Sequence, residues 1–249
     1  ELLTLPVPAE EGCRICAFRK EIQFQSVSFS YQPDRPQVLK DLSFSVKKGE
    51  TVGVIGGTGS GKTSLVHLMR LYTPQGGSIL LDGVSLSEYT TESLRKEITK
   101  VSQETVLFPG TIRENLLLAN AAATEEQCME ALDQVALKQF VTELPQGLDT
   151  VIGESGLMLS GGERQRLGLA QGLLRESRIL LVDEVTANVD QESERIIRMA
   201  LCTLVREKQV TVLAISHRPE FLSDSDRILV LEDGKITEET TFFKRYGEK

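Results

Sequence analysis

The sequence predicts an α/β fold organised around a largely parallel sheet that helices cover on both faces. Strand-like and helix-like segments alternate along much of the chain, which is typical of such sheets. The runs at residues 179–182 and 210–215 are continuously apolar, as central strands of a covered sheet are. Residues 111–145 have helical spacing and few β-branched runs, so we expect a helical block inserted between the strand-bearing halves.

The first strands of the chain are predicted to form a separate antiparallel region. Residues 21–31 alternate apolar and polar side chains, which indicates a half-buried strand. Residues 42–57 hold two further strands with a turn at residues 47–49, and we expect these to be antiparallel as well. The other expected elements are a helix at 64–72 with Leu65, Leu68, Met69 and Tyr72 on one face, strands at 77–83 and 98–103, a helix at 161–175, a strand at 179–184, a helix at 191–207, a strand at 210–216 and a hairpin at 227–239 around Asp233 and Gly234.

Composition narrows the class of protein. The chain has 249 residues, of which 40% are hydrophobic and 26% charged, in line with a folded protein that has a core. Its net charge of −8 argues against a primary nucleic-acid binder, which usually needs a basic face. No apolar run approaches the ~18 residues that would span a membrane, and no signal peptide is visible.

The N-terminal residues 1–20 are rich in Pro and Glu and predict a linker. Because the chain begins with Glu1 rather than Met, we expect it to be a piece of a longer protein. The four cysteines form no close, even framework of the disulfide type. Cys13 and Cys16 would need two more ligands to hold zinc, and neither histidine has suitable spacing, which favours a plain linker.

A glycine-rich stretch at residues 56–64, "GGTGSGKTS", matches the pattern G-x-x-x-x-G-K-[ST]. A strand-like segment precedes it and a helix-like segment follows, as a phosphate-binding loop requires. Its glycines let backbone N–H groups converge on phosphate oxygens. Lys62 would reach the β- and γ-phosphates, and the Thr63 hydroxyl would bind Mg²⁺. An ordinary glycine-rich turn is the alternative, which the strand and helix context weakens.

Two carboxylates, Asp183 and Glu184, end the apolar strand at 179–184. Ligands of such sheets bind at the carboxyl ends of strands, where these side chains would reach a metal ion and a water. Asp183 is the natural Mg²⁺ partner, and Glu184 the natural general base for a water that attacks the γ-phosphate. A solvated strand end is the alternative, which the nearby phosphate loop makes less attractive.

Further polar or aromatic side chains follow other strands. Gln103 has an amide oxygen that would contact both Mg²⁺ and the attacking water, and His217 would donate a hydrogen bond to the γ-phosphate. Tyr31 would stack on a nucleotide base. Each signal is weak alone, because such a histidine is often structural and such a tyrosine often belongs to the core. His67 is interpreted as a packing or surface residue.

Taken together, these residues resemble the nucleotide-binding domain of ABC transporters from about residue 21 onward. The matching pieces, in order, are Tyr31, "GGTGSGKTS", Gln103, "LSGGERQR" at 159–166, "ILLVDE", the "ANVD" at 187–190, and His217. Residues 107–118, "LFPGTIRENLLL", further resemble the exporter branch, in which six transmembrane helices precede this domain.

The resemblance implies two domains that pack head to tail, so that the "LSGGE" of one chain closes on ATP held by the phosphate loop of the other. Ser160, Gly161 and Gly162 open a predicted helix and would offer a hydroxyl, close backbone approach and a positive helix end to the γ-phosphate. Ser160 and Glu163 also fit a capping box, which only starts a helix. Capping does not explain the two glycines between them, since glycine is a poor helix former.

The resemblance also implies a role for each matching residue. Catalytic roles would fall to Glu184 as base, His217 as the contact to the γ-phosphate, and Lys62 and Gln103; Asp190 would cross the dimer interface. Mg²⁺ would be held by Thr63, Gln103 and Asp183. ATP would be held by Tyr31, Gly57, Thr58, Gly59, Ser60, Gly61, Lys62, Thr63 and Ser64, and across the dimer by Ser160, Gly161, Gly162 and Glu163.

Three segments depart from the family pattern. "ANVD" stands where S-A-L-D is usual, and Ser155 stands where exporters often have a basic residue. Gln171 and Gly172 stand where Arg and Ala are usual. These changes fall in segments expected to carry communication between the two ATP sites and with the membrane domain. The residues expected to carry out ATP hydrolysis are intact, so we expect two hydrolysing sites in a homodimer.

The predicted fold class is therefore α/β with a P-loop NTPase (RecA-like) core, an N-terminal antiparallel β-subdomain and an inserted α-helical subdomain at roughly 105–160. The expected protein is the ATPase domain, residues 21–249, of an exporter at the cytoplasmic face of a membrane, with a transmembrane domain fused upstream, a second nucleotide-binding domain as partner and no nucleic acid. An ABC-type ATPase of DNA maintenance is an alternative, although no long coiled coil separates the motifs. A nucleotide sensor that does not hydrolyse ATP is another, although Glu184 is present.

Overall fold

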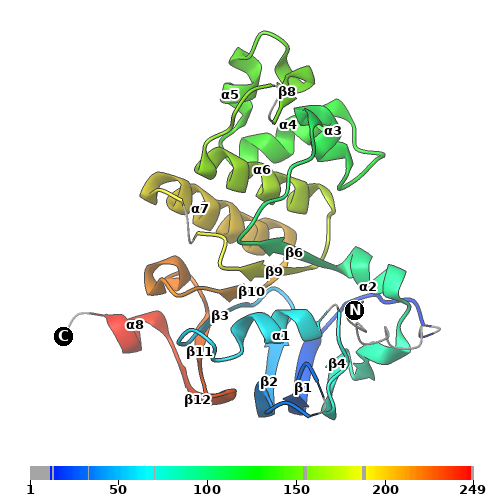
Figure 1. The fold of residues 1–249 in the computed structure, drawn as a ribbon, viewed down its shortest axis with the longest axis vertical. Coiled ribbons are helices and arrows are strands. Elements are labelled where there is room, and N and C mark those ends of the chain that lie inside the picture. The colour runs from blue at the N-terminus through cyan, green and yellow to red at the C-terminus, as the bar shows by residue number, and fades with distance from the viewer. Residues whose placement is uncertain are drawn as a thin grey trace.

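A computed structural model describes residues 12, 14–32, 34–69, 71–153, 156–186 and 189–247. Its central feature is a six-stranded sheet with the strand order β12-β11-β3-β10-β9-β6 (Figure 1). Five strands run parallel, and β12 pairs antiparallel with β11. The strands are β3 (Thr51–Ile55), β6 (Ile98–Ser102), β9 (Ile179–Asp183), β10 (Thr211–Ile215), β11 (Arg227–Glu232) and β12 (Lys235–Thr240).

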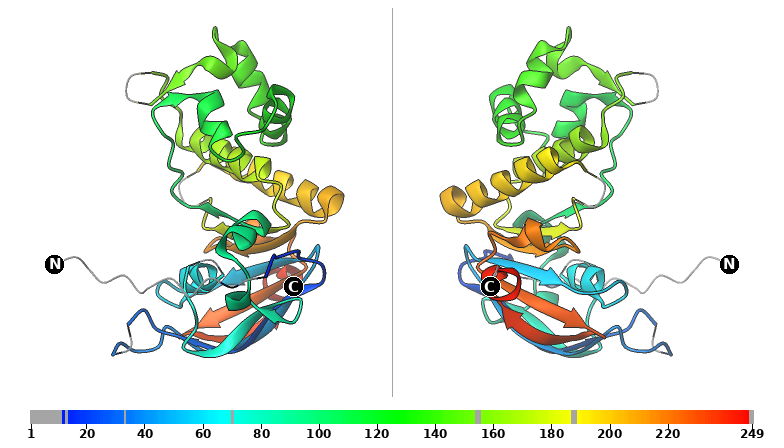
Figure 2. Two further views of the ribbon diagram at one scale, coloured as in Figure 1. Left: turned by 90° about the vertical axis from the view of Figure 1, so that its right-hand side faces the viewer. Right: turned by 90° about the vertical axis from the view of Figure 1, so that its left-hand side faces the viewer.

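A second, four-stranded sheet of order β2-β1-β4-β5 is antiparallel throughout. It lies at the end of the molecule opposite the helical subdomain (Figure 2). Its strands are β1 (Glu21–Phe29), β2 (Leu39–Lys47), β4 (Gly76–Leu81) and β5 (Val84–Ser85).

The two faces of the parallel sheet are buried in different cores, because successive side chains of a strand point to opposite faces. Ile179 and Leu181 of β9 belong to the core that contains helix α1 (Lys62–Leu68) and the antiparallel sheet. Leu180 and Val182 belong to the core that contains helices α6 (Gly161–Leu174) and α7 (Gln191–Lys208). The parallel sheet is therefore covered on both faces, as predicted.

The helical subdomain lies beyond α6 and α7 and far from the antiparallel sheet (Figure 1). Its buried residues continue the core of α6, which contacts both α3 and α4. It comprises α3 (Ile112–Leu117), α4 (Glu125–Gln134), α5 (Lys138–Glu143), the 3₁₀ turn η2 (Gly147–Asp149) and a short antiparallel pair, β7 (Gly110–Thr111) with β8 (Val151–Ile152). The shorter elements outside it are η1 (Leu86–Glu88), α2 (Thr91–Glu97), η3 (Pro219–Leu222) and α8 (Phe242–Tyr246).

The structure confirms the predicted fold class and most elements, with three differences. Strand β3 belongs to the parallel sheet between β11 and β10, so its expected antiparallel arrangement is wrong. Helices α2 and α8 and the β7–β8 pair were not predicted, because each is too short to show a period. The described residues 14–20 of the expected linker pack on the domain, where Cys16 and Phe18 are buried. Cys13 lies outside the described residues, and burial raises the pKa of the Cys16 thiol to about 12.

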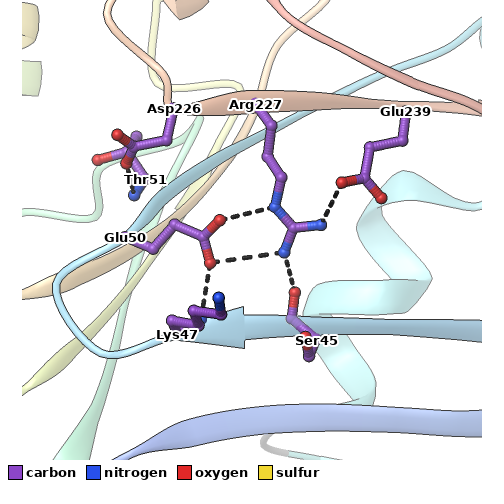
Figure 3. Close-up of polar contacts among 7 residues, drawn as sticks. All are labelled: Ser45, Lys47, Glu50, Thr51, Asp226, Arg227 and Glu239. Carbon is purple, nitrogen blue, oxygen red and sulfur yellow. Dashed lines mark hydrogen bonds and ion pairs between the residues drawn. The ribbon is translucent and has the colours of Figure 1, made fainter.

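Arg227, at the start of β11, ties the two sheets together (Figure 3). Its guanidinium donates to both carboxylate oxygens of Glu50, in the turn before β3, and to the carboxylate of Glu239 on β12. It also donates to the backbone carbonyl of Ser45 on β2. The Arg227 and Glu50 side chains are only 19% and 16% exposed, so this pair is largely shielded from solvent.

We expect Arg227→Met to lower the free energy of unfolding by about 3 kcal/mol, because it leaves the largely buried Glu50 carboxylate without its cationic partner. Urea denaturation followed by circular dichroism measures the change. Arg195→Met is the matched control, since the Arg195–Glu192 pair is exposed and its loss should leave the midpoint unchanged. Equal midpoints for both variants would contradict the structural role of Arg227.

Candidate functional site

The phosphate loop lies between the end of β3 and the start of α1. Gly61 caps α1 with a left-handed backbone, φ 105°, and a Cβ there would lie 2.6 Å from Leu39 Cδ2. Only glycine fits this conformation and this space. By contrast, a Cβ on Gly57 or Gly59 would meet no atom within 4 Å. The loop therefore packs on one side and is open on the other, as a cradle for phosphate must be.

Lys62 holds this loop together from inside. Its Nζ donates to the carbonyl oxygens of Gly56 and Gly57 at 2.8 and 2.9 Å, and the side chain is buried. The same Nζ lies 3.9 Å from Glu184 Oε1. Ser60 Oγ is a buried hydroxyl of the loop with no hydrogen-bond partner among the described residues. Both groups are donors suited to an oxyanion.

Glu184 follows directly after β9 and has an unusual backbone. Its φ is 51°, in the left-handed region that residues with a side chain rarely adopt, and its N–H donates to the carbonyl of Ile215 at 3.0 Å. Its Oε2 lies 3.6 Å from His217 Nδ1. A carboxylate is thus held between Lys62 and His217 beside the phosphate loop, which is the placement that a base for an attacking water requires.

The other predicted metal ligands follow neighbouring elements of the parallel sheet or lie in α1. Asp183 ends β9 and is buried, and its register partner on β6 is Ser102. Gln103, one residue later, is therefore expected at the same edge of the sheet as Glu184. Thr63 and Gln103 are both solvent-exposed. A hydroxyl, an amide oxygen and a carboxylate form an all-oxygen set, which suits Mg²⁺.

Tyr31 lies at the end of β1, with its ring edge-on to Phe29 and Tyr72. Its hydroxyl lies 2.9 Å from Ser64 Oγ and 3.1 Å from His67 Nδ1. Burial raises the pKa of the Tyr31 phenol, which keeps it protonated. Although the ring is partly exposed, its hydroxyl is fixed on α1 beside the phosphate loop. His67, predicted as a packing or surface residue, is a partner of this hydroxyl.

The second glycine-rich stretch starts α6. Ser160 forms the predicted capping box with Glu163: its Oγ accepts from Glu163 N at 3.2 Å, and Ser160 N donates to Glu163 Oε2 at 2.7 Å. Among the described residues, no hydrogen bond or ion pair joins residues 160–163 to the phosphate loop of the same chain. The capping explanation is thus correct, and in the described part of the chain it leaves residues 160–163 without a polar contact to the phosphate loop.

Gly162 is explained by the packing of α6 on α7. A Cβ on Gly162 would lie 2.3 Å from Ser193 Oγ and 3.0 Å from Asp190 Oδ2. Asp190 caps α7 by accepting from Ser193 N at 2.8 Å and from Ser193 Oγ at 2.9 Å, and these hydrogen bonds lower the pKa of its carboxyl. Arg166 donates to the same serine hydroxyl at 2.6 Å. The start of α6 is therefore joined to the start of α7.

Comparisons with known proteins show the family to which this chain belongs. A family model described as "ABC transporter" matches residues 39–187. The "ATP-dependent lipid A-core flippase" of Alkalilimnicola ehrlichii is 41% identical over 244 residues, which cover 97% of this chain and 41% of that protein. The protein of the same name from Idiomarina loihiensis is 40% identical over 243 residues, covering 96% and 41%.

The chain belongs to the ABC transporter family. Among solved structures, a bacterial Atm1-family ABC exporter with ATP bound matches with a TM-score of 0.85 and 35% identity, over 96% of this chain and 41% of that chain. The predicted identity, a nucleotide-binding ATPase domain of the exporter type, is confirmed. The chain spans about 41% of the length of these relatives. None of the described helices is both long and apolar enough to cross a membrane.

Two of the departures from the ABC transporter pattern have structural roles. Gln171 Nε2 donates to the carbonyl of Asn115 at 2.8 Å, which fixes α6 to α3. Gly172 lets α6 approach β6, since a Cβ there would lie 3.0 Å from Val101 Cγ2. Ser155 and two residues of "ANVD", Ala187 and Asn188, lie outside the described residues.

The sequence analysis missed two residues that contact the segments of the candidate site. Gln165 on α6 donates to the carbonyl of Ser102 at 2.8 Å and accepts from Thr105 Oγ1 at 3.1 Å, so it connects this helix to the segment around Gln103. Lys100 Nζ lies 2.9 Å from Asp183 Oδ2. A signal for Lys100 was present, because a charged residue in the middle of a strand predicted to belong to a covered sheet needs a partner.

Gly162→Ala should lower the free energy of unfolding by about 1–2 kcal/mol, because forcing a methyl group against Ser193 and Asp190 outweighs the gain in helix propensity. Thermal denaturation measures the effect. Adding Ser193→Ala should recover part of the loss, since the Ser193 hydroxyl is the nearest atom. Gly57→Ala, whose Cβ meets open space, is the stability control. A Gly162→Ala protein as stable as the parent would show that α6 and α7 are not closely packed here.

Proposed function

We propose that this chain is the domain that binds and hydrolyses ATP for an exporter, with Glu184 as the base that orients and deprotonates the attacking water. The observation that supports this most strongly is the position of Glu184, whose carboxylate oxygens lie 3.9 Å from Lys62 Nζ and 3.6 Å from His217 Nδ1. Lys62 would exchange its loop carbonyls for the β- and γ-phosphates, and His217 would contact the γ-phosphate.

The loop would hold the triphosphate through the backbone N–H groups of residues 57–64, with Ser60 Oγ as a further donor. Tyr31 would pack on the adenine, with its hydroxyl kept in place by Ser64 and His67. Thr63, Gln103 and Asp183 would hold Mg²⁺, which would neutralise charge on the phosphates. Among the described residues, no group of three or more His, Cys, Asp or Glu side chains could hold a metal by itself, in keeping with an ion that substrate phosphates help to bind.

A second copy of this domain is proposed to complete each site. The outer side of residues 160–163 has no hydrogen-bond or ion-pair partner in the phosphate loop of its own chain, and it presents a helix start to anionic groups. In a head-to-tail dimer, that segment would close over ATP held by the phosphate loop of the other copy. Each ATP would then be bound by residues of both protomers and would stabilise the dimer, and hydrolysis would let the protomers separate.

A transmembrane domain upstream of residue 21 is the other proposed partner, which would place the domain at the cytoplasmic face of a membrane. A hollow of about 400 Å³ on the helical subdomain is lined by Val106, Leu107, Phe108, Met158 and neighbouring residues. Val106, Phe108 and Met158 are 58–70% exposed, an arrangement suited to an apolar protein contact. The relatives' names, flippase and exporter, support movement of a lipid-like or other cargo, whose identity belongs to the transmembrane part.

Glu184→Gln should reduce ATP turnover by about 10²–10⁴-fold while ATP binding is retained, because the amide cannot accept the proton of the attacking water. Phosphate release at a protein concentration high enough for dimerisation measures turnover, and a fluorescent ATP analogue measures binding. Glu192→Gln is the matched control, since that carboxylate is exposed on α7 and pairs with Arg195. Undiminished turnover would remove Glu184 from this role. No turnover in the parent protein would favour a nucleotide sensor.

Ser160→Arg should prevent ATP-dependent dimerisation, because a large side chain at this helix start would block the partner's nucleotide from approaching. We expect the Glu184→Gln protein with ATP to sediment as a dimer, and the Glu184→Gln/Ser160→Arg protein as a monomer that still binds ATP. Ser87→Arg, on the exposed turn η1, is the control and should leave the dimer intact. If the Glu184→Gln/Ser160→Arg protein dimerises with ATP as readily as its parent, the head-to-tail arrangement is refuted.

A further inference from the structure

Lys100 occupies a position in β6 where a cation is out of place. Ile98, which precedes Lys100 on the same face of the strand, is fully buried. Leu181, the register partner of Lys100 on β9, is fully buried as well. Both belong to the core between the parallel sheet and α1. An ammonium group in such a row is unfavourable unless it meets an opposite charge.

That opposite charge is Asp183. Lys100 Nζ lies 2.9 Å from Asp183 Oδ2, and the two side chains are 19% and 8% exposed. Within the described part of the chain, no other ion pair or side-chain hydrogen bond involves Asp183. The site thus has two lysines and two adjacent carboxylates, with Lys62 beside Glu184 and Lys100 beside Asp183.

Among the described residues, Lys100 is the cation that forms an ion pair with Asp183. Burial lowers the pKa of the His67 imidazole on α1, and the charge of Lys100 lowers it further against the opposing effect of Asp183. No ion pair joins His67 to Asp183 in the described part of the chain, and His67 Nδ1 lies 3.1 Å from the Tyr31 hydroxyl. Lys100 is therefore the charge that balances Asp183 in this structure.

Under the proposed function, Asp183 also has to serve Mg²⁺. Two cations on one carboxylate repel each other, and the repulsion is strong where water is largely excluded. We propose that Lys100 is a built-in counter-ion that competes with Mg²⁺ for Asp183 and weakens metal binding at the ATP site. It is a positioning residue, which acts on the metal through Asp183.

The test measures Mn²⁺, a substitute for Mg²⁺, by the electron paramagnetic resonance signal of the free ion. The protein carries Glu184→Gln to prevent hydrolysis and is in molar excess over ATP, so that the ion binds to nucleotide held by protein. We expect Lys100→Met to bind Mn²⁺ about tenfold more tightly than this parent, the order of effect that one nearby like charge has on a charged group. Lys100→Gln, which is also neutral, should behave in the same way.

Two matched variants separate this effect from a general change of charge or structure. Lys100→Arg keeps the charge and should retain the parent affinity within about twofold. Lys96→Met removes the same charge from an exposed pair with Glu92 on α2 and should have no effect. In EDTA, ATP affinity should not rise in Lys100→Met. The rise in melting temperature on adding Mn²⁺ and ATP should be larger in Lys100→Met than in the parent, because the metal restores a counter-charge to Asp183.

Unchanged or weaker Mn²⁺ binding in both neutral variants would overturn the inference, as would an equal gain in ATP affinity with and without metal. A parent protein that binds no ATP would instead overturn the proposed function, and this inference with it. The two failures are therefore distinguishable in one titration series.

Discussion

The parallel pairing of β3, β10, β9 and β6 is the constraint on which the site depends. Because these strands run in the same direction, their carboxyl ends meet at one edge, and the segments that follow them lie side by side. The phosphate loop follows β3, His217 follows β10, Glu184 follows β9 and Gln103 follows β6. The strand register aligns the ends of these strands. Asp183 of β9 pairs with Ile215 of β10 on one side and with Ser102 of β6 on the other. The segments that follow these four strands therefore lie at one edge of the sheet, although they are far apart in the sequence.

Helix α6 connects the parallel sheet to the helical subdomain through close packing and hydrogen bonds. Three of its glycines allow close approach, Gly162 to α7, Gly168 to Thr105 and Gly172 to β6. Gln165 and Gln171 add hydrogen bonds to the segment after β6 and to α3. The helix therefore contacts the segment after β6, the helical subdomain and the cap residues of α7.

Most of the architecture was predictable because its signals are local. Apolar runs, the G-x-x-x-x-G-K-[ST] pattern and the turn at Asp233 and Gly234 each specify their own conformation, and the structure contains the expected strands, loop and hairpin. The partner of β3 was not predictable in this way, since pairing in a sheet depends on strands almost anywhere in the chain. The same holds for the Lys100–Asp183 and Gln165–Ser102 contacts, which join residues about sixty or more positions apart. The sequence showed that a glycine at position 162 is unusual in a helix. The cause is the Ser193 hydroxyl of α7, which leaves no room for a side chain and is a tertiary contact that local sequence does not predict.

Residues 14–20 are part of the folded unit. Asp82, in the turn after β4, accepts hydrogen bonds from the backbone N–H groups of Arg19, Lys20 and Glu21, while Phe18 is almost completely buried. A recombinant fragment cut at Glu21 would retain every motif for nucleotide chemistry and still lack a piece of its own interior. The Asp82 carboxylate would lose two of its three backbone donors, and the core beside the antiparallel sheet would lose Cys16 and Phe18. An expression boundary chosen from motifs alone would therefore give a poorly behaved fragment, although the chemistry it was meant to preserve would be complete.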